Sequence, residues 1–378
     1  MEFPFELPFL FDAASETCPA GRISAERIDG CVKAGAGAVC APTFEASRAF
    51  LPDAAENEID ERNTRLVQSV RDAAGNVPVG GVLGPTGFLV PPLGESDFED
   101  IYAAYREQVS ALDEVGADFL LLNRQTSLAD MRAALLAARS TNLPVFACLA
   151  LDENGMTKAG TQFLPALITL QAMGADAVGI CGVPDEKMLS EIHGAVPHAS
   201  VPLIVIADSK PGQTPEEYAE TVQPLLDAGV RIVGCGQNTT AEHLKQLKDN
   251  MKKYGSPEIP EEPDCYAAAI EREAFFLGDD IIFSKPIRCS SSLSDDLIDL
   301  DDEQVSAALV DITSIDDAAL LGQSSSMTKL SAAVRADSPT VLEAALRYFQ
   351  GRLIIDSGSP IEREVLEPLA AKYGAIIY

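Results

Sequence analysis

Residues 116–122 read Gly-Ala-Asp-Phe-Leu-Leu-Leu, and residues 174–181 read Gly-Ala-Asp-Ala-Val-Gly-Ile-Cys. In both stretches a glycine, which ends helices readily in the left-handed conformation, precedes a run of apolar residues. Continuous apolar runs are typical of strands covered on both faces, as in a parallel sheet. Glycines also stand just before the apolar runs that begin at Ala38 and Ile232. These junctions indicate a repeated helix–strand unit with parallel strands.

The same unit recurs along the first two thirds of the chain. Each apolar run is followed by a polar turn and then by a stretch with helical periodicity. Eight parallel strands close a (βα)8, or TIM, barrel, and a doubly wound open sheet is the alternative. We therefore predict a barrel over residues 1–253. Its strands are Phe9–Asp12, Ala38–Ala41, Val79–Leu83, Asp118–Asn123, Val145–Leu149, Ala177–Cys181, Leu203–Asp208 and Ile232–Gly236.

The composition changes at residue 254. Residues 254–264 read Tyr-Gly-Ser-Pro-Glu-Ile-Pro-Glu-Glu-Pro-Asp, and the prolines and acids of this stretch favour a linker. Beyond it we predict a smaller α/β domain over residues 265–378. Its strands are expected at 309–312, 353–356 and 375–378, and its helices at 339–349 and 361–372. The acids between Asp295 and Glu303 are interpreted as a solvated turn and helix face.

Charge and composition exclude several classes of protein. The 378 residues include 28 Lys and Arg against 58 Asp and Glu, a net charge of −30. Such a field repels phosphate backbones and anionic lipid, so we expect neither nucleic acid nor membrane as a partner. No apolar run of about 18 residues and no signal-peptide pattern is found, which predicts a cytoplasmic location. The eight cysteines lack framework spacing, which favours free thiols or a metal site over disulfides.

Functional side chains of a barrel lie at the carboxyl ends of its strands. Gly84-Pro85-Thr86-Gly87 is better explained as a tight turn, and Thr239–Glu242 as a capping box with Thr239 at the N-cap. No catalytic triad can be assembled from the three histidines, and no lysine at a strand end suggests an aldolase or lyase. The remaining candidates are Asp12, Thr43, Glu45, Asn123, Arg124, Asp152, Cys181, Asp208 and residues 235–238, Cys-Gly-Gln-Asn.

Several segments together resemble the homocysteine S-methyltransferase domain, over about residues 7–250. They are Phe11-Asp12, Pro-Thr-Phe-Glu-Ala-Ser-Arg (42–48), Gly-Val-Leu-Gly-Pro-Thr-Gly (81–87), Tyr-Arg-Glu-Gln (105–108), residues 116–122 and 174–181, and Ile-Val-Gly-Cys-Gly-Gln-Asn-Thr-Thr-Ala-Glu-His-Leu (232–244). The resemblance implies a (βα)8 barrel, which in some proteins is the N-terminal module of cobalamin-dependent methionine synthase. Residues 341–359 look like the middle of a pterin-binding barrel, of which only about four strands' worth is present.

The resemblance also implies a zinc ion held by three thiolates, from one Cys after the sixth strand and a Cys pair after the eighth. Such a zinc keeps a substrate thiol deprotonated and nucleophilic toward a methyl donor. The sixth-strand motif Gly-x-Asn-Cys reads Gly179-Ile180-Cys181 here, and Gly236 and Gln237 stand at the Cys pair. Cys235 is one position early, so its side chain should face away from the site. Cys181 and Cys235 remain as a candidate metal-binding remnant, and the zinc ligand set is incomplete.

Other positions depart from the family pattern. The acidic residue common after the fourth strand is replaced by Asn123-Arg124, and Pro-Asn after the seventh strand reads Ala207-Asp208. Our leading interpretation is a methyltransferase that methylates homocysteine to methionine, or another small nucleophile. Methyltetrahydrofolate or methylcobalamin is a possible methyl donor. The alternative is a non-catalytic barrel that docks a corrinoid protein or another methyl carrier.

A ring of polar residues is predicted to surround an amino-acid-like ligand at the barrel mouth, the opening at the carboxyl ends of the strands. Acids there favour a ligand amine, and Arg124 is expected to neutralise one acid or to bind a carboxylate. We expect an amino-acid-sized pocket at this face and none of that kind at the opposite face. The predicted ring consists of Asp12, Glu45, Asn123, Asp208 and Asn238.

Overall fold

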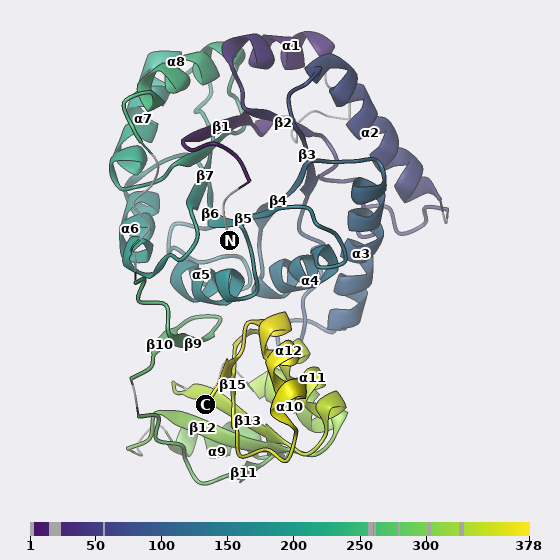
Figure 1. The fold of residues 1–378 in the computed structure, drawn as a ribbon, viewed down its shortest axis with the longest axis vertical. Helices are drawn as coiled ribbons and strands as arrows, with labels where there is room; N and C mark the ends of the chain where they lie inside the picture. Colours follow the sequence, from purple (N-terminus) through teal and green to yellow (C-terminus); the bar gives the residue numbers. More distant parts are fainter. Residues whose placement is uncertain are drawn as a thin grey trace.

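The computed structural model describes residues 4–14, 24–55, 57–255, 260, 262–278, 280–300, 304–324 and 329–378. Eight parallel strands follow one another around a closed barrel, and helices α1–α8 surround it (Figure 1). Strand β1 pairs with both β2 and β8, so the barrel is confirmed and the open sheet is excluded. The strands are β1 (Phe9–Asp12), β2 (Ala38–Ala41), β3 (Val79–Leu83), β4 (Phe119–Gln125), β5 (Val145–Ala150), β6 (Ala177–Gly182), β7 (Leu203–Ala207) and β8 (Ile232–Cys235).

The helices follow their strands in regular alternation. They are α1 (Ala25–Ala34), α2 (Glu58–Ala74), α3 (Phe98–Glu114), α4 (Leu128–Ala138), α5 (Phe163–Ala172), α6 (Glu186–Ala195), α7 (Pro215–Asp227) and α8 (Ala241–Met251). The strand ends differ from the predicted ones by at most two residues. In the part of the chain that the structure describes, no helix has the length and apolar character needed to cross a membrane.

Aromatic rings fill the barrel interior from the amino end of the strands. Phe5, which precedes β1, stacks on Phe9 with 4.5 Å between ring centroids and meets the edges of the Phe119 and Phe146 rings. Gly80 on β3 leaves the space that the Phe119 ring takes, because a Cβ at residue 80 would lie 2.3 Å from that ring. The interior is therefore a packed core at the amino end of the strands, and only the carboxyl end of the barrel is left for a ligand.

A smaller α/β region follows the barrel, as predicted, and lies beside α3, α4 and α5 (Figure 1). Its five-stranded parallel sheet is open, with strand order β11-β12-β13-β15-β16, and a three-stranded antiparallel sheet, β10-β9-β14, packs against α5. The elements are β9 (Ala267–Ile270), β10 (Ala274–Phe276), β11 (Ile287–Arg288), α9 (Leu293–Asp299), β12 (Ala307–Ile312), α10 (Ile315–Ser324), β13 (Ser331–Ala336), α11 (Pro339–Tyr348), β14 (Gly351–Arg352), β15 (Ile354–Ile355), α12 (Arg363–Tyr373) and β16 (Ile376–Ile377).

Two predictions for this region fall partly outside the described residues. Residues 256–259 and 261 of the predicted linker are among the undescribed ones, so its bounds stay a prediction. The acidic patch loses residues 301–303 in the same way, and its described members Asp295 and Asp299 are exposed on α9. The likeness of residues 341–359 to a pterin-binding barrel also stays a prediction.

One buried cation joins the barrel to the C-terminal region. Arg132 on α4 is fully buried and donates hydrogen bonds to the carbonyl oxygens of Leu346 (2.5 Å) and Arg347 (3.1 Å) and to Oε1 of Gln350 (3.1 Å). These acceptors lie at the C-terminal end of α11, where the helix dipole favours a positive charge. Burial lowers the pKa of Arg132 to about 10, so the side chain stays charged at neutral pH. Arg132 therefore caps α11 across the interface.

A partly buried carboxyl group near this interface predicts a pH-dependent stability. Burial raises the pKa of Glu271, in the β9–β10 turn, from 4.5 to about 7. Between pH 4.5 and 7 the folded state therefore holds a proton that the unfolded state has lost, so stability should fall as pH rises through this range. We expect a loss on the order of 1–3 kcal/mol, measured by urea unfolding from pH 4.5 to 8.

The Glu271→Gln variant should lose this dependence, because the amide does not titrate. Glu273→Gln, at an exposed position of the same turn, is the matched control and should keep the wild-type profile. Parallel profiles for wild type and Glu271→Gln would contradict the assignment.

Candidate functional site

The polar groups at the barrel mouth come from the ends of β4, β7 and β8. Arg124 lies in an irregularity of β4, where the pairing with β5 shifts register between Leu122 and Gln125. Its φ of 53° and that of Asn238, 60°, are the positive values found outside glycine among the described residues. Non-glycine residues adopt this conformation at a cost, and such strain concentrates at functional sites. Both strained residues border the same opening.

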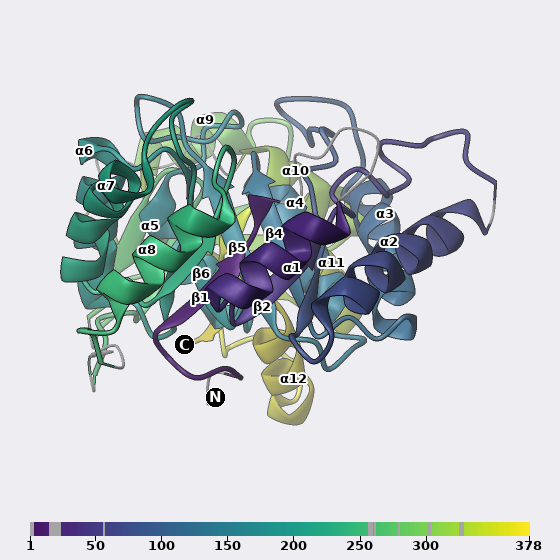
Figure 2. The same ribbon diagram turned by 90° about the horizontal axis from the view of Figure 1, so that it is seen from above.

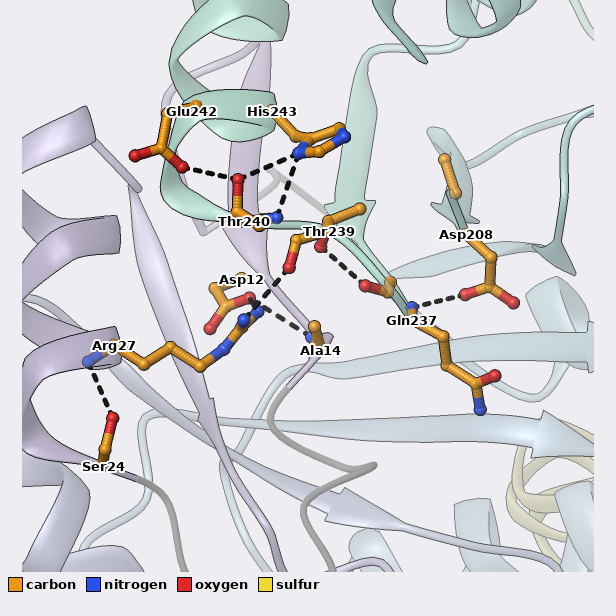
Figure 3. Close-up of polar contacts among 12 residues, drawn as sticks. Asp12, Ala14, Ser24, Arg27, Asp208, Gln237, Thr239, Thr240, Glu242 and His243 are labelled. Atoms are coloured by element: carbon orange, nitrogen blue, oxygen red, sulfur yellow. Dashed lines mark hydrogen bonds and ion pairs between the residues drawn. The ribbon is translucent and has the colours of Figure 1, made fainter. Parts of the chain in front are cut away.

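An ion pair crosses the mouth from β4 to β7. Arg124 Nη2 donates to both carboxylate oxygens of Asp208, at 2.8 and 2.7 Å, and the Gln237 amide donates to Asp208 Oδ1 at 2.7 Å. Asp208 is only 6% exposed. A Cβ at Gly236 would lie 2.2 Å from Asp208 Oδ1, so residue 236 has no room for a side chain. Asp208 thus holds together the ends of three strands, and Figure 3 shows it against the backbone of Gln237.

Two more residues of the predicted ring support this arrangement. Asn123 is buried, and its Oδ1 accepts a hydrogen bond from the Arg124 amide at 2.9 Å, which shapes the turn at the end of β4. Asn238 Nδ2 donates to the Ser209 carbonyl at 3.0 Å and links the loops after β7 and β8. Glu45, after β2, is exposed. Asn123 thus supports the backbone at Arg124, and Asn238 supports the loop that follows Asp208.

Asp12 does not belong to the ring, which corrects our prediction. Its neighbours Phe11 and Ala13 face the barrel interior, so the alternation along β1 turns Asp12 outward toward α1. There Arg27 on α1 binds Asp12 Oδ1 at 3.0 Å and donates to the Thr239 carbonyl at the same distance (Figure 3). Asp12 is fully buried, and its contact with Arg27 anchors α1 to β1.

The capping box before α8 lies one residue later than predicted. Thr240, not Thr239, is the N-cap, and His243 takes the place that we had given to Glu242 (Figure 3). The Thr240 amide donates to His243 Nδ1 at 3.2 Å, and His243 Nε2 contacts the Gln213 carbonyl at 3.0 Å. Both ring nitrogens of His243 are thus engaged in contacts at the start of α8.

Comparison with known proteins decides the family. The family model for homocysteine S-methyltransferase matches residues 29–251. The chain belongs to the homocysteine S-methyltransferase family. Methionine synthase of Mycobacterium tuberculosis is 26% identical over 252 residues, which cover 60% of this chain and 21% of that protein. Methionine synthase of Mycobacterium leprae is 24% identical over 226 residues, 54% of this chain and 19% of that protein.

The chain spans about a fifth of the length of these curated relatives. Among solved structures, the metallated form of the homocysteine methyltransferase MmuM from Escherichia coli superposes with a TM-score of 0.53 at 20% identity. The match covers 64% of this chain and 96% of that one. At this identity the likeness shows the fold, which agrees with the barrel described above.

The two predicted thiols, Cys181 and Cys235, lie on opposite sides of the barrel wall. Cys181 points into the barrel interior, whereas Cys235 lies in the layer between the strands and the helices. Burial raises the pKa of the Cys235 thiol well above its ordinary value, which keeps it protonated. No group of three or more His, Cys, Asp or Glu side chains that could hold a metal is found within the described ranges. The predicted outward orientation of Cys235 is confirmed, and the two thiols face away from each other.

The turn after β3 is anchored by Asp130, a residue that sequence reasoning did not single out. Asp130 Oδ1 accepts hydrogen bonds from the Thr86 amide (3.1 Å), from Thr86 Oγ1 (2.6 Å) and from the Tyr105 hydroxyl (3.1 Å). Tyr105 also donates to the Gly84 carbonyl. The spacing of Ser127 and Asp130 could have predicted the start of α4, because Ser127 is its N-cap and its hydroxyl accepts a hydrogen bond from the Asp130 amide. This start places Asp130 in the first turn of α4.

Our expectation that the face opposite the mouth has no amino-acid-sized pocket is wrong. Two hollows of about 460 and 480 Å3 open at the amino-end face, one between the start of β1 and the end of α8, the other before β5 and β6. The pocket that we expect at the mouth stays a prediction, because residues 15–23, which follow β1, lie outside the described ones.

Proposed function

We propose that this chain is a methyltransferase that binds a small amino-acid-like molecule at its barrel mouth and methylates a nucleophilic atom of that molecule. The observation that carries the proposal is the Arg124–Asp208 pair at the mouth of a barrel of this family. A ligand with both an ammonium and a carboxylate group complements both members of the pair. Homocysteine is the first candidate, and its product is methionine.

In this reaction the sulfur–carbon bond forms as the donor releases its methyl group, and the thiol proton is lost to solvent. The donor is methyltetrahydrofolate or methylcobalamin. The residues of the mouth bind and orient the acceptor, because the backbone at Arg124 and Asn238 is held in a fixed bend. A cytoplasmic location remains our expectation.

The test is methionine formation from homocysteine with each donor, measured by mass spectrometry. We expect donor-dependent product and a loss of kcat/KM of about 10- to 100-fold in Asp208→Asn, since the amide cannot bind an ammonium group as strongly. Glu45→Gln, at an exposed position, is the control and should retain activity. No product with either donor, together with no binding of homocysteine or methionine at millimolar concentration, would contradict the proposal.

A second candidate is a non-catalytic barrel that docks a corrinoid or other methyl-carrier protein. It is favoured by the glycine and glutamine at positions 236 and 237, where the family resemblance places thiolates. Size-exclusion chromatography with a purified corrinoid protein tests it. Co-elution without any methyl transfer would support this candidate over the enzyme.

A further inference from the structure

The charged residues at this mouth differ from the family pattern at two positions. The resemblance places an acid after the fourth strand and an asparagine after the seventh, and this chain has Arg124 and Asp208 there. The two replacements contact each other directly, through both carboxylate oxygens of Asp208. They act as one feature, because Asp208 at 6% exposure needs the positive charge of Arg124.

This ion pair occupies space that a thiolate site requires. Residues 236 and 237 correspond to the cysteine pair of the family, and Asp208 Oδ1 lies against both of them. A cysteine at residue 236 would place its Cβ 2.2 Å from Asp208 Oδ1 and 3.1 Å from the Ala207 carbonyl oxygen. The Asp208 carboxylate and a side chain at 236 therefore exclude each other. Without a gap, the cysteine of the sixth-strand motif Gly-x-Asn-Cys falls on Gly182, one residue after Cys181, and the φ of 144° at Gly182 also disfavours a cysteine.

The electrostatics of the mouth act in the same direction. The guanidinium of Arg124 is a permanent positive charge next to the carboxylate nearest to the thiol positions. A divalent cation placed there would be repelled by Arg124 and would compete with it for Asp208. Of the other two acids predicted for the ring, Asp12 faces α1 and pairs with Arg27, and Glu45 is exposed. The donor set thus does not fit zinc.

We propose that the Arg124–Asp208 ion pair replaces the zinc ion of the family in this barrel, so that the mouth receives its ligand without a metal. The exclusion is mutual: restoring thiols at 236 and 237 does not restore zinc binding while the ion pair is in place. The statement about ligand binding rests on the proposed function, whereas the statement about zinc does not.

The first experiment uses the native chain, purified without chelators. Zinc content is measured by inductively coupled plasma mass spectrometry, and zinc affinity by competition with a chromophoric chelator. We expect far less than one zinc per chain and the same homocysteine binding isotherm with and without EDTA. One zinc per chain, whose removal by EDTA weakens homocysteine binding, would overturn the proposal. No homocysteine binding under either condition would defeat the proposed function and leave the statement about zinc standing.

The second experiment compares two variants that carry the same thiols. One has Gly236→Cys and Gln237→Cys with the ion pair kept, and the other adds Arg124→Gln and Asp208→Ala, which removes both the charges and the side-chain oxygens next to residue 236. Cobalt(II) serves as the probe, because thiolate ligation produces a charge-transfer absorption. We expect the variant without the ion pair to bind cobalt and zinc at least about tenfold more tightly. Equal affinities would overturn the mutual exclusion, and the native-chain measurement remains decisive if either variant fails to fold.

Discussion

Replacement of Arg132 by alanine is expected to lower the free energy of unfolding by about 3 kcal/mol or more. The change removes the donors that serve two carbonyl groups at the end of α11 and Oε1 of Gln350. Each buried acceptor left without a partner costs about 1–3 kcal/mol, and the missing side chain leaves a cavity. Urea unfolding followed by circular dichroism measures the loss. Limited proteolysis should in addition cut the C-terminal region earlier than in wild type.

Arg139→Ala is the matched control, because Arg139, at the C-cap of α4, lies two helical turns after Arg132 on the same side of that helix. It also reaches a carbonyl of the C-terminal region, that of Lys372 at 3.3 Å, but it is exposed. Its loss should cost well under 1 kcal/mol. Similar losses in the two variants would show that burial of Arg132 is not what makes its contacts important.

Replacement of Gly236 by alanine is expected to cost about 2–3 kcal/mol. The new Cβ would overlap Asp208 Oδ1, so the carboxylate must move away from Arg124 and from the Gln237 amide. The same replacement in an Asp208→Ala background should cost less than about 1 kcal/mol, because the overlap is gone. Denaturant unfolding of wild type, both single variants and the double variant measures this coupling.

Gly194 on α6 offers a control, because nothing lies within 4 Å of a Cβ there. Gly194→Ala should be neutral or stabilising by about 0.5–1 kcal/mol, as alanine favours helix. If Gly236→Ala costs the same with and without Asp208, the steric explanation fails.

The barrel could be predicted from sequence because its strands are continuous apolar runs with glycine at their entrances. The same apolar continuity hid the orientation of Asp12. Phe9 to Phe11 are all apolar, so no alternation in the sequence told which face Asp12 would take. The orientation of Cys235 could be predicted, because it stands one residue before the family's cysteine pair and alternate strand residues face opposite sides. The side of a strand on which a residue lies can thus be predicted only where polar and apolar residues alternate, or where an aligned family motif shows the orientation.

The C-terminal region was predicted less completely. Strands β9 and β13 are rich in alanine, which has weak strand propensity. Strand β9 forms because its neighbours β10 and β14 pair with it and α5 covers it, and β13 forms because β12 and β15 flank it. The capping box was misplaced because Thr239 and Thr240 both fit an N-cap, and a glutamate such as Glu242 is the usual partner three residues after the N-cap. The imidazole of His243 supplied an acceptor of the same reach. These choices depend on tertiary contacts that no local pattern contains.

At the mouth, the sequence predicted that Arg124 would neutralise an acid or bind a carboxylate, but not which group. The partner depends on the register shift in β4 and on the missing side chain at residue 236, two features set by neighbouring strands. The spatial choice of Asp208 rather than Glu45 could therefore be made only with the fold in hand.

The packed rings of Phe5, Phe9, Phe119 and Phe146 close the barrel interior at the amino end of its strands. A small molecule admitted at the carboxyl end has to depart by the route through which it arrived. For the proposed reaction between two molecules we therefore expect an order: the inner reactant enters first, the outer one approaches over it, and the outer one withdraws before the inner product escapes. The aromatic stack at one face therefore affects events at the other face of the barrel, which Figure 2 shows from the side.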